Sequence, residues 1–163
     1  MVSEQERIEA VRQILIQLYI LTDKEFPDSR ITRVEREAIF FIYEGTDKYA
    51  QSKPHSADAR ALRKRHSQKD FRQLITCDHA IPLATLREQC KAATASHEAM
   101  ANCLQRFIQI AIITREEDVR LNKLGLRRQL PTGSAVDDMF ARYRAANILF
   151  EPVDEELLSR TTA

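Results

Sequence analysis

Apolar residues recur at helical spacing along most of the chain, whereas strand-like apolar runs are short and few. From Ile8 to Leu18 an apolar residue returns every three or four positions, which places these side chains on one face of a helix. Ser3 and Glu6 have the spacing of a capping box, in which each side chain bonds the backbone N–H of the other residue. The pattern predicts a helix that begins near Glu4 and buries one face, against the core or against a second copy of the chain.

Similar start and stop signals predict further helices. Thr32 with Glu35 and Thr114 with Glu117 again have capping-box spacing, and a glycine such as Gly125 often ends a helix. Ser56 can also cap a helix, and Ser67 to Asp70 resembles a further cap. We expect helices at about 33–44, 57–66, 83–93 and 115–124, helices that follow Ser96 and Ser134, and a short helix near 154–159.

Two apolar runs are candidates for strands. Leu74–Leu83 combines a short apolar stretch with an acid, an imidazole and a proline, and Ile108–Ile113 is rich in β-branched residues, which favour strands. Phe71–Cys77 fits either a short strand or a helix that ends in one. Ile108–Ile113 fits either a strand or an extension of the preceding helix.

These elements predict a mostly α fold, a single helical domain over residues 1–163 with a minor two-stranded β element. The chain contains only three glycines and five prolines, too few for the many turns of an all-β fold. Within the domain we expect an N-terminal helical pair at 1–45, a basic loop and helix at 46–73, a ββα-like region with a helical insertion at 74–125, and C-terminal helices at 134–160.

Cysteine usage and hydropathy indicate the compartment. Cys77, Cys90 and Cys103 are odd in number and form no CxxC pair, which argues against a disulfide framework and a cysteine-rich zinc site. We interpret them as buried free thiols in a reducing compartment. No apolar run approaches the roughly 20 residues of a membrane span, and the acidic N-terminal segment is unlike a signal peptide. We therefore expect a cytoplasmic protein with no membrane segment.

Charge is unevenly distributed, although the formal net charge is only +1. Residues 1–47 contain ten acids and six bases, whereas residues 48–73 contain eight bases and two acids. Such a basic block is typical of a surface that binds an anionic partner such as nucleic acid, although a solvated helix face has the same composition. The predicted nucleic-acid contacts are Arg60, Arg63, Lys64, Arg65, Lys69 and Arg72.

The segment Cys77-Asp78-His79-Ala80-Ile81-Pro82-Leu83 resembles the Asp-His-x-x-Pro-Leu signature of HNH-type endonucleases. That family has a ββα-metal fold, and the order predicted here is also strand, strand and helix. The resemblance implies that Asp78 binds a divalent metal. It implies that His79 activates water as a general base beside the scissile phosphate.

The chain departs from the family in the helix expected at 115–124. HNH-type enzymes supply a His or Asn from this helix to the metal, and the helix here contains no His. Asp118 and Asn122 are the nearest substitutes, because a spacing of four places them on one helical face. Their oxygen ligands suit Mg²⁺ better than Zn²⁺. The implied site is Mg²⁺ held by Asp78 with Asp118 or Asn122.

Two functions are consistent with the sequence. One is HNH-like, metal-dependent cleavage of nucleic-acid phosphodiesters, in a complete or a degenerate form. The alternative is a non-catalytic helical interaction module, an adaptor or a regulatory subunit of a larger complex. In that alternative Asp78 caps the following helix and His79 is a hydrogen-bonded structural residue. The broad apolar face of the first helix favours the alternative, since it offers a surface for a protein partner or a homodimer.

Overall fold

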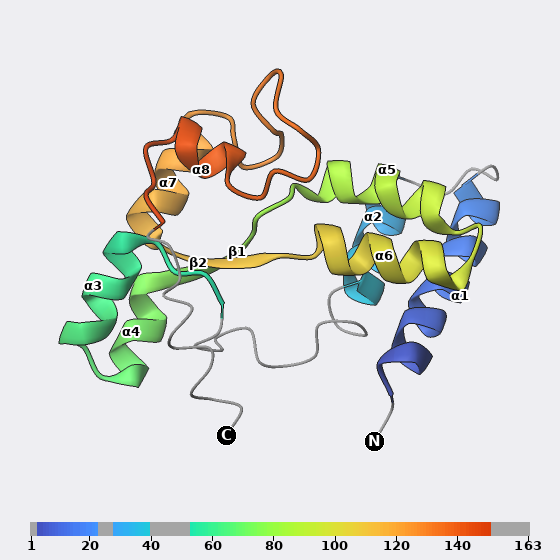
Figure 1. Ribbon diagram of the computed structural model, residues 1–163, viewed down its shortest axis with the longest axis horizontal. Helices are drawn as coiled ribbons and strands as arrows, with labels where there is room; N and C mark the ends of the chain where they lie inside the picture. Colours follow the sequence, from blue (N-terminus) through green and yellow to red (C-terminus); the bar gives the residue numbers. More distant parts are fainter. Residues whose placement is uncertain (1–2, 23–27, 40–52, 151–163) are drawn as a thin grey trace. The chain divides into compact units, whose positions relative to one another are not determined.

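The computed structural model describes residues 3–22, 28–39 and 53–150 (Figure 1). The fold is mostly α with one two-stranded antiparallel sheet, which confirms the predicted class. In chain order the elements are α1 (Glu4–Thr22), α2 (Asp28–Glu37), α3 (Ala57–Arg65), α4 (Gln68–Leu74), β1 (Ile75–His79), α5 (Leu83–Ala93), α6 (His97–Phe107), β2 (Ile110–Thr114), α7 (Arg115–Lys123) and α8 (Ala141–Ala145). None of the helices in the described ranges is both long and apolar enough to cross a bilayer.

The chain divides into two compact units. Unit 1 comprises residues 1–48 and 81–109, and unit 2 comprises residues 49–80 and 110–163. The helices α5 and α6 of unit 1 are therefore inserted in the chain between β1 and β2 of unit 2. A helical insertion at this point was expected from the sequence. The single-domain organisation of residues 1–163 stays a prediction.

Unit 1 is formed by helices that bury the apolar face of α1. In the described residues α1 contacts α2, α5 and α6, and Ile8, Val11 and Leu15 of α1 are buried against this same chain. The capping box at its start is confirmed, because the Ser3 N–H donates to Glu6 and the Glu6 N–H donates to Ser3 Oγ. A homodimer through this helix stays a prediction, and it would have to use the remaining surface of α1.

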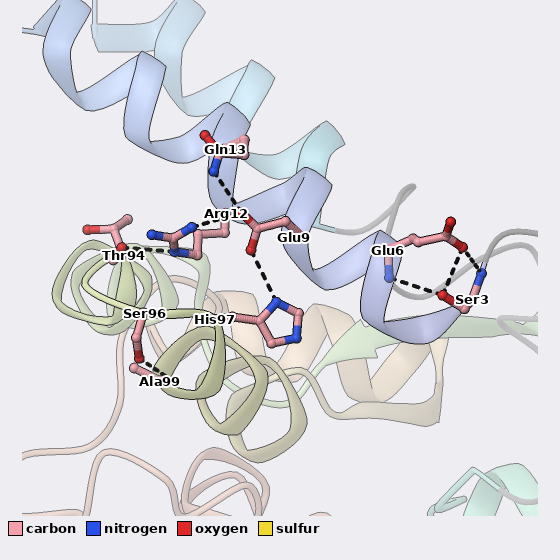
Figure 2. Close-up of polar contacts among 9 residues, drawn as sticks. All are labelled: Ser3, Glu6, Glu9, Arg12, Gln13, Thr94, Ser96, His97 and Ala99. Carbon is pink, nitrogen blue, oxygen red and sulfur yellow. Dashed lines mark hydrogen bonds and ion pairs between the residues drawn. The ribbon is translucent and has the colours of Figure 1, made fainter.

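Polar contacts also hold α1 against α6 (Figure 2). Glu9 lies 3.1 Å from Nδ1 of His97 at the start of α6, and it accepts hydrogen bonds from Arg12 and Gln13 of its own helix. Arg12 donates to the carbonyl oxygen of Thr94 at 3.1 Å. These donors lower the pKa of the Glu9 carboxyl, with the bond from Gln13 the largest cause and that from His97 the next.

The predicted start of the second helix is wrong. We expected a helix from about residue 33, whereas α2 begins at Asp28. Proline restricts the residue before it and leaves the chain after it free to be helical, so Pro27 precedes a helix here. Residues 40–44 of the expected helix lie outside the described residues.

Unit 2 is built on the antiparallel pair β1–β2, in which Ile75 lies opposite Thr114 and His79 lies opposite Ile110. The alternatives left open by the sequence are thereby resolved. The segment from Phe71 is the end of α4 followed by β1, and β2 is a separate strand that starts at Ile110.

Both faces of this sheet are covered by helices. One face packs on α3 and α4 through Ala59, Phe71, Ile75, Ile110 and Ile112. The other face packs on α7, α8 and their flanking turns through Ala80, Ala111, Ile113, Leu121, Leu126, Tyr143, Ala146 and Ile148. A strand covered on both faces turns neither set of its side chains to solvent, which explains why all five residues of β2 are buried.

The segment 54–56 completes the environment of β2. The Ile112 N–H donates to the Pro54 carbonyl and the Ser56 N–H donates to the Ile112 carbonyl. Strand β2 therefore has backbone partners on both edges, β1 on one and residues 54–56 on the other. Ser56 is fixed in this way directly before α3.

The prediction of a helix that starts directly after Ser134 is also wrong. Within the described residues 134–150 the helix is limited to Ala141–Ala145, and Val136 is exposed in a turn. Asp138 accepts a hydrogen bond from the Phe140 N–H at 3.1 Å. Such a side-chain bond to the backbone two residues on stabilises a turn in competition with a helix. The short helix expected near 154–159 lies outside the described residues.

Candidate functional site

Asp78 lies on β1 as part of a polar cluster with residues of α8. Its Oδ2 accepts hydrogen bonds from Nη2 of Arg142 and from the hydroxyl of Tyr143, each at 2.7 Å. Arg142 and Tyr143 are fully buried, and Asp78 is half-buried. The carboxylate that resembles a metal ligand is therefore engaged in a buried ion pair across unit 2.

Arg142 binds backbone as well as Asp78. Its Nε donates to the carbonyl oxygen of Ala80 at 2.9 Å, and its Nη1 donates to that of Leu126 at 3.0 Å. Nη2 also donates to the carbonyl oxygen of His79. One guanidinium thus fixes the end of β1 and the turn after α7, where backbone groups would otherwise lack partners.

Tyr143 acts as a hydrogen-bond donor in this cluster. Burial of the phenol is the main cause that raises the pKa of Tyr143 well above its ordinary value, and the negative charge of Asp78 is the next. The hydroxyl therefore keeps its proton. It donates that proton to the Asp78 carboxylate.

Asp78 and His79 lie on opposite faces of the sheet. Successive residues of a strand point to opposite sides, and residues directly opposite one another in the β1–β2 pair share a side. Asp78 pairs with Ala111 of the α7–α8 face, whereas His79 pairs with Ile110 of the α3–α4 face. The two adjacent side chains therefore do not converge on one point.

The other predicted metal ligands lie on α7. Asp118 is half-buried and its Oδ1 lies 3.9 Å from Nε of Arg127, while Asn122 is exposed. In the part of the chain that the structure describes, no three His, Cys, Asp or Glu side chains gather as a metal-binding group. The oxygen donors of Asp78, Asp118 and Asn122 are of the kind that Mg²⁺ prefers. The metal roles of Asp78, Asp118 and Asn122 stay predictions.

Arg142 and Tyr143 are the residues of this cluster whose role the sequence did not indicate. The sequence signal for this contact is the apolar character of the residues that surround each of the two charges. Asp78 is an acid in an apolar strand, and Arg142 is a base flanked by Ala141 and Tyr143 in an apolar segment. A charge that a strand or helix carries into an apolar interior requires an opposite charge there.

The predicted nucleic-acid contacts gather on two consecutive helices of unit 2. We call the side chains of Arg60, Arg63, Lys64, Arg65, Lys69 and Arg72 the α3–α4 basic surface. Lys64, Arg65, Lys69 and Arg72 are exposed, and Arg60 and Arg63 are half-exposed. The two helices contain only two acids, Asp58 and Asp70, so their net charge is +4.

Local contacts hold the α3–α4 basic surface in place. The guanidinium of Arg63 lies over the ring of Phe71, 5.2 Å from its centroid, and Phe71 is buried against the sheet. Ser56 caps α3 by accepting from the Ala59 N–H, and Ser67 caps α4 by accepting from the Asp70 N–H. Both caps lie where the sequence predicts them.

A buried carboxylate ties the start of α3 to the start of α7. Glu117 Oε2 accepts from the Ser56 hydroxyl and from the Thr114 N–H, each at 2.7 Å. The Glu117 N–H in turn donates to Thr114 Oγ1, which confirms the predicted capping box. Negative charge is favourable at a helix N-terminus, and Glu117 lies at two of them.

Comparison with known proteins gives no relative of this chain. No family model, no curated protein and no solved structure matches it.

Proposed function

We propose that the protein binds the phosphodiester backbone of a nucleic acid through the α3–α4 basic surface. The observation that carries the proposal is the arrangement of six basic side chains, opposed by two acids, on two capped helices. Phosphate contacts by Lys and Arg supply most of the affinity of sequence-independent nucleic-acid binding.

Three of the six charges of this surface have no opposite charge paired with them among the described residues. In the described ranges Lys64, Arg65 and Lys69 form no ion pair with another residue. Asp70, the acid next to Lys69, accepts a hydrogen bond from the Ser67 hydroxyl at 2.7 Å. Cations that have no internal partner remain available to phosphate, and helices fixed by caps and by Phe71 lose little freedom on binding.

The test is the salt dependence of binding to a labelled double-stranded oligonucleotide. Log affinity plotted against log salt has a negative slope for such binding. A double variant with Lys64→Gln and Arg65→Gln should make this slope less steep by roughly 1.8, since each lost phosphate contact contributes about 0.9. The matched control is Arg33→Gln with Lys91→Gln, which removes two exposed bases of unit 1. Binding that is absent, independent of salt, or reduced equally by the control would contradict the proposal. An absence of binding would favour the interaction module.

Cleavage of the bound phosphodiester is a narrower proposal, supported by the order of elements in unit 2. Strand β1 ends in His79, pairs with β2, and β2 leads directly into the capped helix α7, the order of the HNH-type motif. In this proposal His79 takes a proton from the attacking water.

Cleavage is tested by incubating the chain with DNA or RNA and Mg²⁺ or Mn²⁺. His79→Ala should abolish the reaction, whereas the control His66→Ala, at an exposed position after α3, should retain it. Failure of wild-type cleavage, or its survival in His79→Ala, would overturn the catalytic role and leave the binding proposal intact.

A further inference from the structure

Two cysteines of unit 1 face each other inside the helical packing. Cys90 of α5 and Cys103 of α6 are both buried, and their Sγ atoms lie 3.6 Å apart. Neither forms a disulfide in this structure, and Cys77 of unit 2 is also unbridged. The helices α5 and α6 are joined by the short connection at 94–96 and pack against each other. The two thiols are therefore held in contact by consecutive helices.

The two sulfurs are not equivalent. The bond between them raises the pKa of Cys90, together with burial and the negative charges of Cys103 and Glu35. The same bond lowers the pKa of Cys103. The contact permits either thiol to donate to the other sulfur, and burial of Cys90 favours its protonated form. Cys103 keeps 7% of its surface whereas Cys90 keeps none, so Cys103 is also the more accessible sulfur.

The charge near Cys90 comes from a buried ion pair. Glu35 of α2 is fully buried, and its Oε2 lies 2.6 Å from Nε of Arg87 on α5. Arg87 is one helical turn before Cys90 on that helix. The position of Glu35 is therefore fixed by the packing of unit 1, and its charge favours the protonated form of Cys90 over a thiolate.

We propose that Cys90 and Cys103 are a redox-modification site that small hydroperoxides convert to an intramolecular disulfide. The Cys103 sulfur attacks the peroxide oxygen, the O–O bond breaks, and water or an alcohol leaves with the Cys103 proton. The Cys90 sulfur then attacks the sulfenic sulfur of Cys103, forming the S–S bond. Hydroxide leaves and takes the Cys90 proton as water. Two thiols are oxidised by two electrons, one peroxide is reduced, and an external thiol reverses the change.

The geometry requires only a small movement. A disulfide has an S–S distance of about 2.05 Å, so the two sulfurs must approach by about 1.5 Å. We expect rotation of the two side chains to supply movement of this size while α5 and α6 stay packed. The disulfide would close a loop that contains the α5–α6 connection.

The test uses the full chain with Cys77→Ser, which leaves only the proposed pair. After hydrogen peroxide, the chain is unfolded in urea with excess N-ethylmaleimide and its intact mass is measured. The expected product is a monomer that has lost two hydrogen atoms and carries no maleimide, and that takes up two maleimides after reduction. Oxygen adducts or disulfide-linked dimers as the main product would overturn the proposal.

Single variants and an equilibrium measurement separate the site from general thiol chemistry. With Cys90→Ser, Cys103 should stop at the sulfenic acid and react with dimedone, whereas Cys103→Ser should leave Cys90 unlabelled. The opposite result would overturn the assigned order of attack. In thiol–disulfide buffer the Cys77→Ser chain should be more fully oxidised when folded than in concentrated urea, and equal or lower oxidation of the folded chain would also overturn the proposal. This measurement does not depend on whether the single variants fold.

Discussion

At the scale of single residues, Arg142 shows how unit 2 tolerates a charge in its interior. Its guanidinium is fully buried, yet it donates to the Asp78 carboxylate and to backbone carbonyls at the end of β1 and after α7. A buried ion pair adds little net stability compared with apolar side chains, but removal of one partner leaves an uncompensated charge. The cluster is therefore sensitive to loss of either member.

Replacing Arg142 with methionine should lower the free energy of unfolding by about 3–5 kcal/mol, because Asp78 then keeps a partly buried charge without its partner. Arg144→Met is the matched control in the same helix. Arg144 pairs with Asp138 at an exposed position, and its loss should cost less than about 1 kcal/mol. Urea unfolding followed by circular dichroism measures both.

A second substitution distinguishes the charge from simple loss of packing. Adding Asp78→Asn to Arg142→Met removes the unpaired carboxylate, so the double variant should be more stable than the single variant. A double variant that is less stable than Arg142→Met would contradict the account of Asp78 as an ion-pair partner.

His55 introduces a pH dependence through its environment in unit 2. Burial is the main cause that lowers the pKa of His55, and it outweighs the bond from Nδ1 to the Lys53 carbonyl. The folded chain therefore binds fewer protons at this site than the unfolded chain, whose His pKa is about 6.5. The contribution of His55 to stability is present above that value and is lost as pH falls through the folded pKa.

The urea midpoint of the wild-type chain should therefore decrease as the pH is lowered from about 7 to about 5.5, through and below the unfolded His pKa. In His55→Asn part of this fall should disappear, since asparagine keeps a donor for the Lys53 carbonyl but does not titrate. His66→Asn, at an exposed position, is the control and should keep the wild-type profile. Identical profiles for all three chains would refute the role of His55.

The residues that the sequence located correctly are those with local partners. The capping pairs Ser3–Glu6, Ser67–Asp70 and Thr114–Glu117 join positions three apart, so sequence spacing alone identifies them. Arg142 and Asp78 are 64 positions apart, and no local pattern specifies that contact. The opposite directions of Asp78 and His79 follow from the strand itself, but which helices cover each face depends on packing that no local pattern specifies.

At the scale of elements, Glu117 joins two helices that are far apart in sequence. It accepts from Ser56, the N-cap of α3, and it completes the capping box of α7. The sequence predicts each cap separately, because each is a local pattern. It does not predict that one carboxylate serves both, since that depends on the packing of α3 beside β2.

Glu117→Ala should destabilise the chain by about 2–4 kcal/mol, because two buried donors, the Ser56 hydroxyl and the Thr114 N–H, lose their acceptor. Asp70→Ala is the matched control, since Asp70 accepts from Ser67 in the same N-cap geometry at an exposed site. Its loss should cost about 0.5–1 kcal/mol. Equal losses in urea unfolding would contradict the buried role of Glu117.

At the scale of the whole molecule, the division into two units raises the question of whether unit 2 requires the α5–α6 insertion. Unit 2 has apolar clusters of its own on both faces of the sheet. Continuing the β1–β2 register by one step places Ala80 opposite Gln109. An Asn-Gly pair is the preferred two-residue connection of such a hairpin.

A chain of residues 53–80 and 109–150 joined by Asn-Gly should therefore fold and unfold cooperatively in urea. Protection of the Ile112 N–H from hydrogen exchange would report the native β2, because that group donates to the Pro54 carbonyl. Loss of cooperativity and of this protection, compared with the full chain, would instead support the single domain predicted from the length of the sequence.

The insertion also sets the order in which the chain can become native during synthesis. The last residue of unit 1 is Gln109, whereas unit 2 includes the later elements β2, α7 and α8. Unit 1 is thus fully synthesised first, although β1 of unit 2 is synthesised before the end of unit 1. At 5–20 residues per second β1 waits roughly 2–7 s for its partner strand. During this interval its unpaired edge is open to other chains, so the nascent protein is most exposed to misassembly while its first unit is still being completed.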